Sequence, residues 1–321
     1  VFRVHRRPGP GETAIGDGFG MFLGGKGFNQ AVAARRLGAD VTFVGRCGAD
    51  DFGHRFTDAL KREGITASVT LDEEEGTAVA CPTVDARGEN SIIVVPRANR
   101  RLSSADVERA RPAIEAADVL MLQFEVNLAA SRRAAEIARA AGTAVLLDPA
   151  PAEHDHGESL TTKTQRHERH QEGALTSEAK GQKPNVKSEF LDRSLIGGIE
   201  ADVLVPNEHE AAVLAHSDNP ADWPARLLRP SMKTLVVSLG EAGAAVFDAQ
   251  GRREFPAFVV DAVDSTGAGD AFRAGLAVRL AEGADTDAAV RFANACGALA
   301  CTVLGAEPSM PHRAAVEALL R

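Results

Sequence analysis

Aromatic residues and cysteines are scarce in this chain of 321 residues. It has no tyrosine and one tryptophan, and aromatic residues make up 5% of it. Proteins that bind single-stranded nucleic acids stack bases on aromatic side chains, so this scarcity argues against such a role. There are four cysteines without a C-x-x-C pair, each among apolar or small residues: Cys47, Cys81, Cys296 and Cys301. We expect reduced thiols in the core rather than disulfides or a metal cluster.

The chain also lacks a surplus of positive charge and any long apolar run. It has 36 lysines and arginines against 45 aspartates and glutamates, a formal net charge of −9. Binding to nucleic acid or to an anionic membrane needs a basic face, which this balance disfavours. No apolar run approaches the roughly 20 residues that span a bilayer, and residues 1–11 are too basic for the apolar core of a signal peptide. We therefore expect a cytoplasmic protein in which any phosphate-binding site is a small local one rather than an extended basic surface.

Short β-branched runs alternate with longer alanine-rich runs along the chain. This order is typical of an α/β fold, in which helices cover both faces of a mostly parallel sheet. The expected strands are 41–45, 119–122, 144–147, 203–205 and 234–238, and the expected helices are 26–37, 52–63, 128–141, 207–216, 268–281, 286–301 and 312–320. Two hairpins, 77–95 and 244–255, interrupt the alternation, and a flap that stands off the main sheet could arise at the first. We expect a single domain over residues 1–321.

Residues 154–189 break this pattern. The segment has almost no apolar periodicity, mixed charge, and many Gln, Thr, Lys and His residues. Such a segment buries too little surface to offset its ordering entropy, and it is longer than ordinary loops of α/β folds. We interpret it as a disordered surface insertion. Its pairs His154/His156 and His167/His170 have no carboxylate or thiolate partners at metal-binding spacing, which favours solvated side chains over a metal site.

The strongest chemical signal is the motif DSTGAGD at 264–270, which opens an apolar helix. Glycines at a helix start let backbone N–H groups converge on an anion, and the helix dipole favours negative charge there. Asp270 in the first turn could merely complement that dipole. Its place beside a phosphate-sized site favours a second interpretation, a general base for chemistry at a phosphoryl group.

Two further motifs lie at expected helix starts. GGKGFNQA at 24–31 is neither a P-loop nor a dinucleotide fingerprint. It suits either tight packing or, through Lys26 and Asn29, recognition of several hydroxyls, as in a sugar. In PNEHEAA at 206–212, Asn207 and Glu210 form either a plain capping box or, at the carboxyl edge of the sheet, a site for hydrated Mg²⁺ and nucleotide phosphates.

These motifs, together with LDPAPA at 147–152, resemble those of ribokinases in the PfkB family of sugar kinases, in the same order over nearly the whole chain. The resemblance implies a three-layer α/β/α fold with a mostly parallel central sheet and a small β lid formed by residues 1–20 and 76–97. It also implies ATP-dependent phosphorylation of the primary hydroxyl of D-ribose, with Mg²⁺ and K⁺ as cofactors. A homodimer formed through the lid is implied as well.

The resemblance also implies roles for individual residues. Asp270 would be the base, and the N–H groups of Gly267, Ala268 and Gly269 would form the anion hole for the γ-phosphoryl group. The residues expected to line the sugar pocket are Gly25, Lys26, Gly27, Asn29, Glu125 and Asp270. Those expected beside the nucleotide are Asn207, Glu210, Ser238, Gly240, Gly243, Gly269 and Asn294, with Glu210 holding Mg²⁺ through water. A monovalent cation would be held, largely by backbone carbonyls, at Asp264, Thr266, Ala300, Val303, Gly305 and Ser309.

The chain departs from the ribokinase pattern at several places. The opening strand that in ribokinases carries an Asn and an Asp for the sugar would lie just before Val1, so we expect an incomplete pocket. Phe28 replaces a small residue, Arg97 replaces a glycine, and Pro82 removes a hydrogen-bond donor from a lid strand. These departures leave two alternatives open: a related kinase for deoxyribose, fructose or a nucleoside, and a truncated, catalytically impaired member of the family.

Overall fold

The main sheet of the protein has six strands. The computed structural model describes residues 1–87, 90–152, 196 and 198–321, so the expected insertion at 154–189 and its four histidines lie outside the described residues. The strand order is β12-β11-β10-β9-β8-β7. Their bounds are β7 Val119–Leu122, β8 Ala144–Leu147, β9 Val203–Leu204, β10 Thr234–Ser238, β11 Ala244–Asp248 and β12 Gly251–Phe255. Strands β7 to β10 are parallel, and β11 and β12 add an antiparallel hairpin at one edge.

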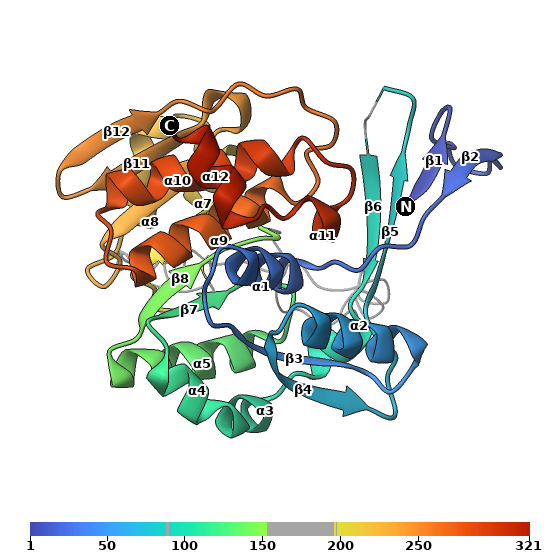
Figure 1. Ribbon diagram of the computed structural model, residues 1–321, viewed down its shortest axis with the longest axis horizontal. Coiled ribbons are helices and arrows are strands. Elements are labelled where there is room, and N and C mark those ends of the chain that lie inside the picture. The colour runs from blue at the N-terminus through green and yellow to red at the C-terminus, as the bar shows by residue number, and fades with distance from the viewer. Residues whose placement is uncertain (88–89, 153–195, 197) are drawn as a thin grey trace, which may run out of the picture.

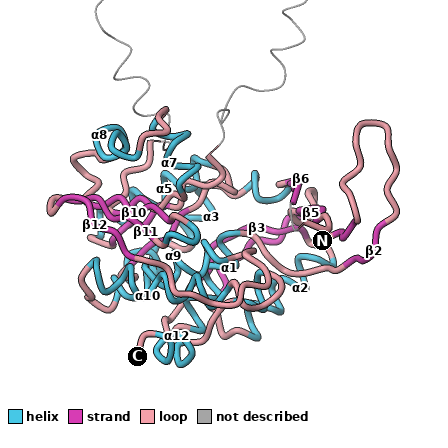
Figure 2. The backbone as a smooth tube through the Cα atoms, turned by 90° about the horizontal axis from the view of Figure 1, so that it is seen from above, coloured by secondary structure: helices cyan, strands magenta, loops and turns pink. Residues whose placement is uncertain are grey.

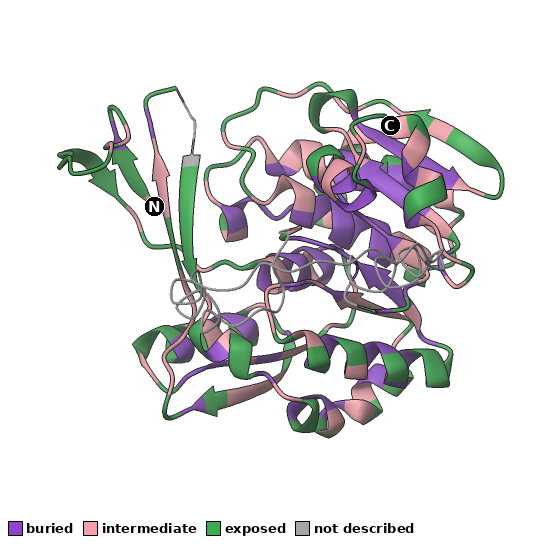
Figure 3. Cartoon of the chain, turned by 180° about the vertical axis from the view of Figure 1, so that it is seen from behind, coloured by how far each residue is buried: buried purple, intermediate pink, exposed green. Residues whose placement is uncertain are grey.

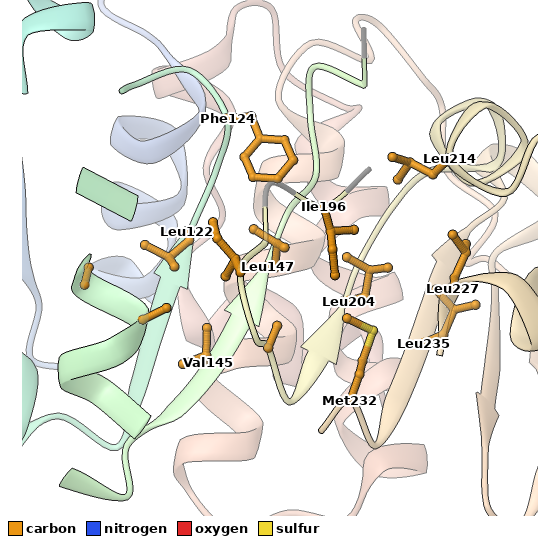
Figure 4. Close-up of a cluster of buried hydrophobic side chains, with 14 of the residues drawn as sticks. Leu122, Phe124, Val145, Leu147, Ile196, Leu204, Leu214, Leu227, Met232 and Leu235 are labelled. Atoms are coloured by element: carbon orange, nitrogen blue, oxygen red, sulfur yellow. The ribbon is translucent and has the colours of Figure 1, made fainter. Parts of the chain in front are cut away.

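Helices cover both faces of this sheet (Figure 1). On one face, Leu147, Leu204 and Leu235 belong to a buried cluster, shown in Figure 4, that includes residues of α5 (Leu128–Ala141), α7 (Glu208–Ala215) and α8 (Trp223–Leu227). On the other face, Leu146 and Val236 pack with α9 (Ala268–Ala281) and α10 (Thr286–Ala300). Neighbouring strand residues thus point to opposite faces, and both faces are buried, as parallel sheets require. The result is the expected three-layer α/β/α fold.

A second, smaller sheet lies beside the first. It consists of β3 (Thr42–Gly48) and β4 (Thr66–Asp72), which run parallel, with α1 (Lys26–Arg36) and α2 (Asp51–Arg62) packed nearby. Among the described residues, no hydrogen-bonded ladder joins β3 to β7. Instead, a continuous cavity of about 2610 Å³ is lined by residues of both strands. We call this boundary between β3 and β7 the seam; α1 and α9 pack against each other across it.

A four-stranded sheet stands to one side of the body (Figures 1 and 2). Its order is β2-β1-β5-β6, with bounds β1 Phe2–Val4, β2 Gly16–Phe19, β5 Val79–Val84 and β6 Asn90–Val95. We call it the lid. Several apolar side chains of β6 are exposed, as Figure 3 shows for that strand. The remaining elements are α3 (Ser104–Arg109), α4 (Arg111–Ala116), α11 (Ala306–Ser309), α12 (Arg313–Leu319) and the short 3₁₀ helices η1 (Arg97–Arg101), η2 (Pro220–Asp222) and η3 (Gly240–Ala242).

Two of the four cysteines lie where they were expected, and two do not. All four are free, and Cys47 and Cys296 are buried, but Cys81 is exposed and Cys301 is half-buried. The prediction of four core thiols was therefore wrong for these two. The reason for Cys81 is its position on β5: the lid stands off the body, which leaves that side chain uncovered.

Two departures from the ribokinase pattern, Phe28 and Arg97, can be placed in the structure. Phe28 is 2% exposed, and its ring packs against Phe56 with centroids 4.9 Å apart, so it is a core residue of α1. Arg97 has φ = 39°, in the left-handed region that favours glycine.

In the part of the chain that the structure describes, no helix is both long and apolar enough to cross a bilayer.

Candidate active site

Asp270 lies at the centre of a buried polar cluster at the seam. It occupies the first turn of α9 and is 7% exposed. Asn29 on α1 donates from Nδ2 to its Oδ2 at 2.8 Å, and Gln30 donates from Nε2 to its Oδ1 at 3.1 Å. The packing of α1 against α9 therefore brings together two motifs that are 240 residues apart.

Burial changes the acid–base character of Asp270. Desolvation raises the pKa of this carboxyl above the ordinary aspartate value, and nearby Asp148 raises it further. The charge of Lys26 and the hydrogen bond from Asn29 oppose that rise. A carboxylate with a raised pKa accepts a proton more readily, which is the property a general base needs.

The first turn of α9 presents backbone donors next to Asp270. Gly267 is the N-cap with φ = 83°, in the left-handed region that favours glycine, and a Cβ there would also lie 3.3 Å from the Ala306 Cα. The Ala268 N–H donates to the Ser265 carbonyl at 3.1 Å. The N–H groups of Gly267 and Gly269 donate to no acceptor within the described chain. Of the three expected anion-hole donors, two are therefore open to a ligand.

The glycine-rich start of α1 packs against the segment that follows β7. Gly25 is the N-cap with φ = 104°, and the Lys26 N–H donates to Glu125 Oε2 at 2.9 Å. A Cβ on Gly27 would lie 3.1 Å from Gln123 Oε1, so the backbone approaches closely there. Burial raises the pKa of Glu125. The whole expected sugar set, Gly25, Lys26, Gly27, Asn29, Glu125 and Asp270, lines the cavity at the seam.

Asn29 carries a buried acceptor without a donor. Its Oδ1 makes no hydrogen bond although it is fully buried, and among the described residues it is the one side-chain polar atom in that state. A buried acceptor left unpaired costs about 1–3 kcal/mol. The amide therefore fits a ligand that brings a hydroxyl donor to this point, beside the Asp270 carboxylate.

Several of the residues expected beside the nucleotide make hydrogen bonds to other groups of the protein. Asn207 and Glu210 form a reciprocal capping box at the start of α7, as the simpler interpretation predicted: Oδ1 of Asn207 accepts from the Glu210 N–H at 2.7 Å, and Glu210 Oε2 accepts from the Asn207 N–H at 2.8 Å. Asn294 donates from Nδ2 to the carbonyls of Phe255 and Pro256. The described lining of the seam cavity includes none of Asn207, Glu210, Ser238, Gly240, Gly243 and Asn294. Their contact with a nucleotide stays a prediction.

Among these residues, Gly243 has a firm steric reason to be glycine. Its φ is 97°, and a Cβ there would lie 2.0 Å from the Phe255 carbonyl oxygen. Ser238, at the end of β10, forms a single bridge with Asn207, which links β10 to the start of α7. The segment from Ser238 to Gly243 is thus a tightly packed turn.

The expected cation loops are clamped together by Asp264. Its Oδ1 accepts from the Thr266 N–H at 2.9 Å and its Oδ2 from the Gly305 N–H at 2.8 Å. Burial opposes ionisation of Asp264, but these hydrogen bonds outweigh it and hold its pKa below the ordinary value. The carboxylate and loop carbonyls are hard oxygen donors, which fits a weakly held monovalent cation. Binding there, also by Ala300, Val303 and Ser309, stays a prediction; no cluster of three His, Cys, Asp or Glu side chains suited to a metal occurs in the described part.

The sequence interpretation gave no role to two charged residues that complete the cluster, Asp148 and Arg273. Asp148, after β8, is fully buried and accepts from Gln30 Nε2 at 2.9 Å. Arg273 on α9 lies with its Nε 3.1 Å from Asp148 Oδ1. The Lys26 ammonium is 3.7 Å from Asp148 Oδ2. One signal was present: Arg273 is a lone positive charge in the apolar stretch 271–278, and a buried charge needs a partner.

Comparison with known proteins agrees with this geometry. Residues 2–165 and 165–313 match the family described as pfkB family carbohydrate kinase. A ribokinase of Bacillus subtilis (strain 168) is 34% identical over 327 aligned positions, which cover 100% of this chain and 95% of the relative. A deoxyribokinase of Salmonella typhi is 30% identical, over 96% of this chain and 90% of its own length.

A solved structure is similar over the same extent. The Arabidopsis thaliana ribokinase complexed with ribose and ATP has a TM-score of 0.76 and 28% identity to this chain, covering 100% of it and 94% of the plant protein. The chain therefore belongs to the pfkB family of carbohydrate kinases and is a phosphotransferase that acts on a sugar hydroxyl.

Proposed function

We propose that the protein is an ATP-dependent kinase that phosphorylates the primary hydroxyl of D-ribose to give ribose 5-phosphate. The observation that carries this proposal is the buried pair of Asp270, at the start of α9, and Asn29, at the start of α1. It places a carboxylate base next to an unpaired amide acceptor, which suits one sugar hydroxyl that gives up its proton and a neighbouring hydroxyl that donates a hydrogen bond. Ribokinases from several organisms among the relatives support the choice of sugar.

Transfer proceeds by in-line attack in this proposal. Asp270 takes the proton of the primary hydroxyl, and the freed oxygen attacks the terminal phosphorus of ATP, which releases ADP. The open N–H groups of Gly267 and Gly269 stabilise the charge that develops on the phosphoryl oxygens, together with the dipole of α9. Catalysis here comes from positioning and electrostatics rather than from a covalent intermediate.

The sugar would lie between the starts of α1 and α9. Asn29 Oδ1 accepts a hydrogen bond from one hydroxyl, and Glu125 and Lys26 are close enough to each other to contact further hydroxyls. Because Gly25 and Gly27 have no side chains, the sugar ring could lie close to the backbone there. The lid, residues 1–20 and 76–97, would cover this pocket and exclude water.

The nucleotide and its ions would occupy the other side of Asp270. We assign the base and ribose of ATP to the region of Ser238, Gly240, Gly243 and Asn294, and the phosphates to Asn207, Glu210 and Gly269. Mg²⁺, held through water by Glu210, would neutralise phosphate charge. K⁺ at the loops clamped by Asp264 would activate the enzyme by ordering the start of α9. A cytoplasmic location stays a prediction from the sequence.

A coupled assay of ADP release tests the proposed function. We expect turnover with MgATP and D-ribose, faster with K⁺ than with Na⁺, and lower kcat/KM for D-fructose and a nucleoside. 2-Deoxy-D-ribose is the second candidate, because a deoxyribokinase covers the chain almost as fully as the ribokinases do. A kcat/KM higher with 2-deoxy-D-ribose than with D-ribose would make 2-deoxy-D-ribose the preferred substrate. No ADP release above the sugar-free background, from protein that unfolds cooperatively, would contradict the kinase assignment for this chain.

We also propose that two chains form a homodimer through their lids. Ile92 and Val94 of β6 line the seam cavity and Ile93 lies on the opposite face of the strand, and all three are more than half exposed, at 53%, 57% and 69%. A sheet that is apolar on both faces is stable in water when both are covered.

The matched variants for the dimer are Ile93→Lys in the lid and Val259→Lys in a loop of the body, where Val259 is 99% exposed. Sedimentation velocity at micromolar concentration should show a dimer for the unmodified chain and for Val259→Lys, and a monomer for Ile93→Lys. An unmodified chain that stays monomeric would contradict the proposal.

A further inference from the structure

Arg273 is a charged side chain on a helix that is otherwise apolar along this stretch. It is 3% exposed, and its neighbours Ala271, Phe272, Ala274 and Leu276 are all buried. Burial of an unpaired guanidinium would be very costly, so each of its donors must be accounted for. The side chain of a helical residue leans toward the N-terminus, which directs this guanidinium back over the first turn of α9.

Two sides of the guanidinium are held by the protein. Nε donates to the Val205 carbonyl at 2.9 Å and lies 3.1 Å from Asp148 Oδ1. Nη2 donates to Glu210 Oε2 at 3.1 Å. These contacts tie α9 to the residues after β8 and β9 and to the start of α7. They also fix the plane of the guanidinium.

The third side faces the expected anion hole. Nη1 has no hydrogen-bond acceptor among the described residues. A Cβ placed on Gly269 would lie 2.6 Å from it, so Nη1 lies directly against the backbone of the turn that also carries Asp270. The Gly269 N–H, itself without an acceptor, and Nη1 are thus two open donors on one turn. Glycine at 269 leaves the space that the guanidinium occupies.

The cluster has no surplus of positive charge, so a phosphate that binds here must bring its own counter-ion. Asp148, Glu210 and Asp270 contribute three carboxyl groups, and Arg273 with Lys26 contributes two cations. Asp148 and Glu210 pair with Nε and Nη2 of the guanidinium, so Nη1 is the nitrogen that can bind a ligand. An oxygen of a phosphate is the acceptor that best matches an arginine N–H fixed in this way.

We propose that Arg273 is a catalytic residue that binds the terminal phosphate of ATP through Nη1, a role that rests on the function proposed above. The guanidinium keeps its proton throughout. As the bond from the terminal phosphorus to ADP breaks and the bond to the sugar oxygen forms, Nη1 stays on an oxygen of the transferred group and offsets its charge. The sugar proton goes to Asp270. Nε and Nη2 meanwhile hold Asp148 and Glu210, so one side chain links Asp148, the phosphate and the capping box of α7.

Binding of ATP and of ADP, each with Mg²⁺ and without sugar, separates this role from turnover. In Arg273→Lys the positive charge remains, but the fixed N–H directed at the anion hole is lost. Calorimetry should show ATP affinity reduced at least about tenfold, with ADP and D-ribose affinities within about twofold of the unmodified protein. The kcat should fall by about 10² or more, the scale found for loss of one fixed donor to a developing charge. An unchanged ratio of ATP to ADP affinity would overturn the proposal.

A double variant distinguishes catalysis from ion pairing. Arg273→Gln alone removes the guanidinium that pairs with buried Asp148 at 3.1 Å and leaves only the more distant Lys26 ammonium, so we expect a lower melting temperature. Arg273→Gln with Asp148→Asn removes both partners and should recover most of that loss, while ATP discrimination and kcat stay low. Recovery of kcat together with the melting temperature would show that Arg273 only balances Asp148, and would overturn the proposal. If the unmodified chain binds both nucleotides but phosphorylates no sugar, the proposed function fails, and the ratio of ATP to ADP affinity still decides the role of Arg273.

Discussion

Asp270→Asn is expected to lower kcat for sugar phosphorylation by a factor of about 10² to 10⁴, the range of general-base contributions. The amide has nearly the shape of the carboxylate and can still contact Asn29 and Gln30, but it cannot accept the hydroxyl proton. Affinity for D-ribose should change less than about threefold, because the ground-state sugar keeps its other contacts. Steady-state kinetics and calorimetric sugar binding measure the two quantities separately.

A second aspartate provides the control for helix-dipole effects. Asp287 lies in the first turn of α10, as Asp270 does in α9, but pairs with Arg253 away from the seam. Asp287→Asn should lower the free energy of unfolding by less than about 1 kcal/mol, the usual size of a dipole contribution, and leave kcat unchanged. A kcat for Asp270→Asn within about tenfold of the unmodified enzyme would remove Asp270 from the role of base.

Asn29→Leu is expected to reduce kcat/KM for the sugar by about 10² or more. The leucine loses the hydrogen bond to the Asp270 carboxylate and the acceptor for a sugar hydroxyl. A hydrogen bond to a charged group contributes about 1.5–3 kcal/mol and a neutral one about 1 kcal/mol, which together account for that factor. The comparable volume of the two side chains keeps α1 packed on α9, which a thermal melt checks.

The dependence on pH gives Asn29→Leu a second readout. The hydrogen bond from Asn29 favours the charged carboxylate and therefore lowers the pKa of Asp270, while burial raises it. Removing the bond raises that pKa further. Because the base works only when deprotonated, the acid limb of kcat/KM should move to higher pH in the variant. A loss of kcat/KM with an unmoved limb would contradict the coupling between Asn29 and the base.

Local patterns were sufficient to predict most of the elements. The bounds of β7, α5, β8, β10 and α9 agree with the structure residue for residue, because turn and cap residues frame each of them. Asn127 caps the start of α5, and Gly142, with φ = 85°, ends it. Strand β4 was not predicted, although it is seven residues long. Helix α3 was not predicted either, although Ser103 and Asp106 form a capping box that the sequence displays.

Long-range pairing accounts for what the sequence could not predict. The motifs that carry Asn29 and Asp270 were each recognised, but their contact depends on how α1 packs against α9 across 241 residues of chain. Arg273 and Asp148 each look like an isolated charge until folding places them 3.1 Å apart.

The packing of α1 on α9 makes the hydrophobic core part of the active site. Phe28 on α1 and Ala271 on α9 belong to one buried cluster, and Asn29 and Asp270 are the next residues along these two helices. The hydrogen bond between Asn29 and Asp270 is 2.8 Å long, so a shift of α1 against α9 by less than about 1 Å would weaken or break it. The position of the base relative to the sugar therefore depends on apolar side chains that touch neither ligand.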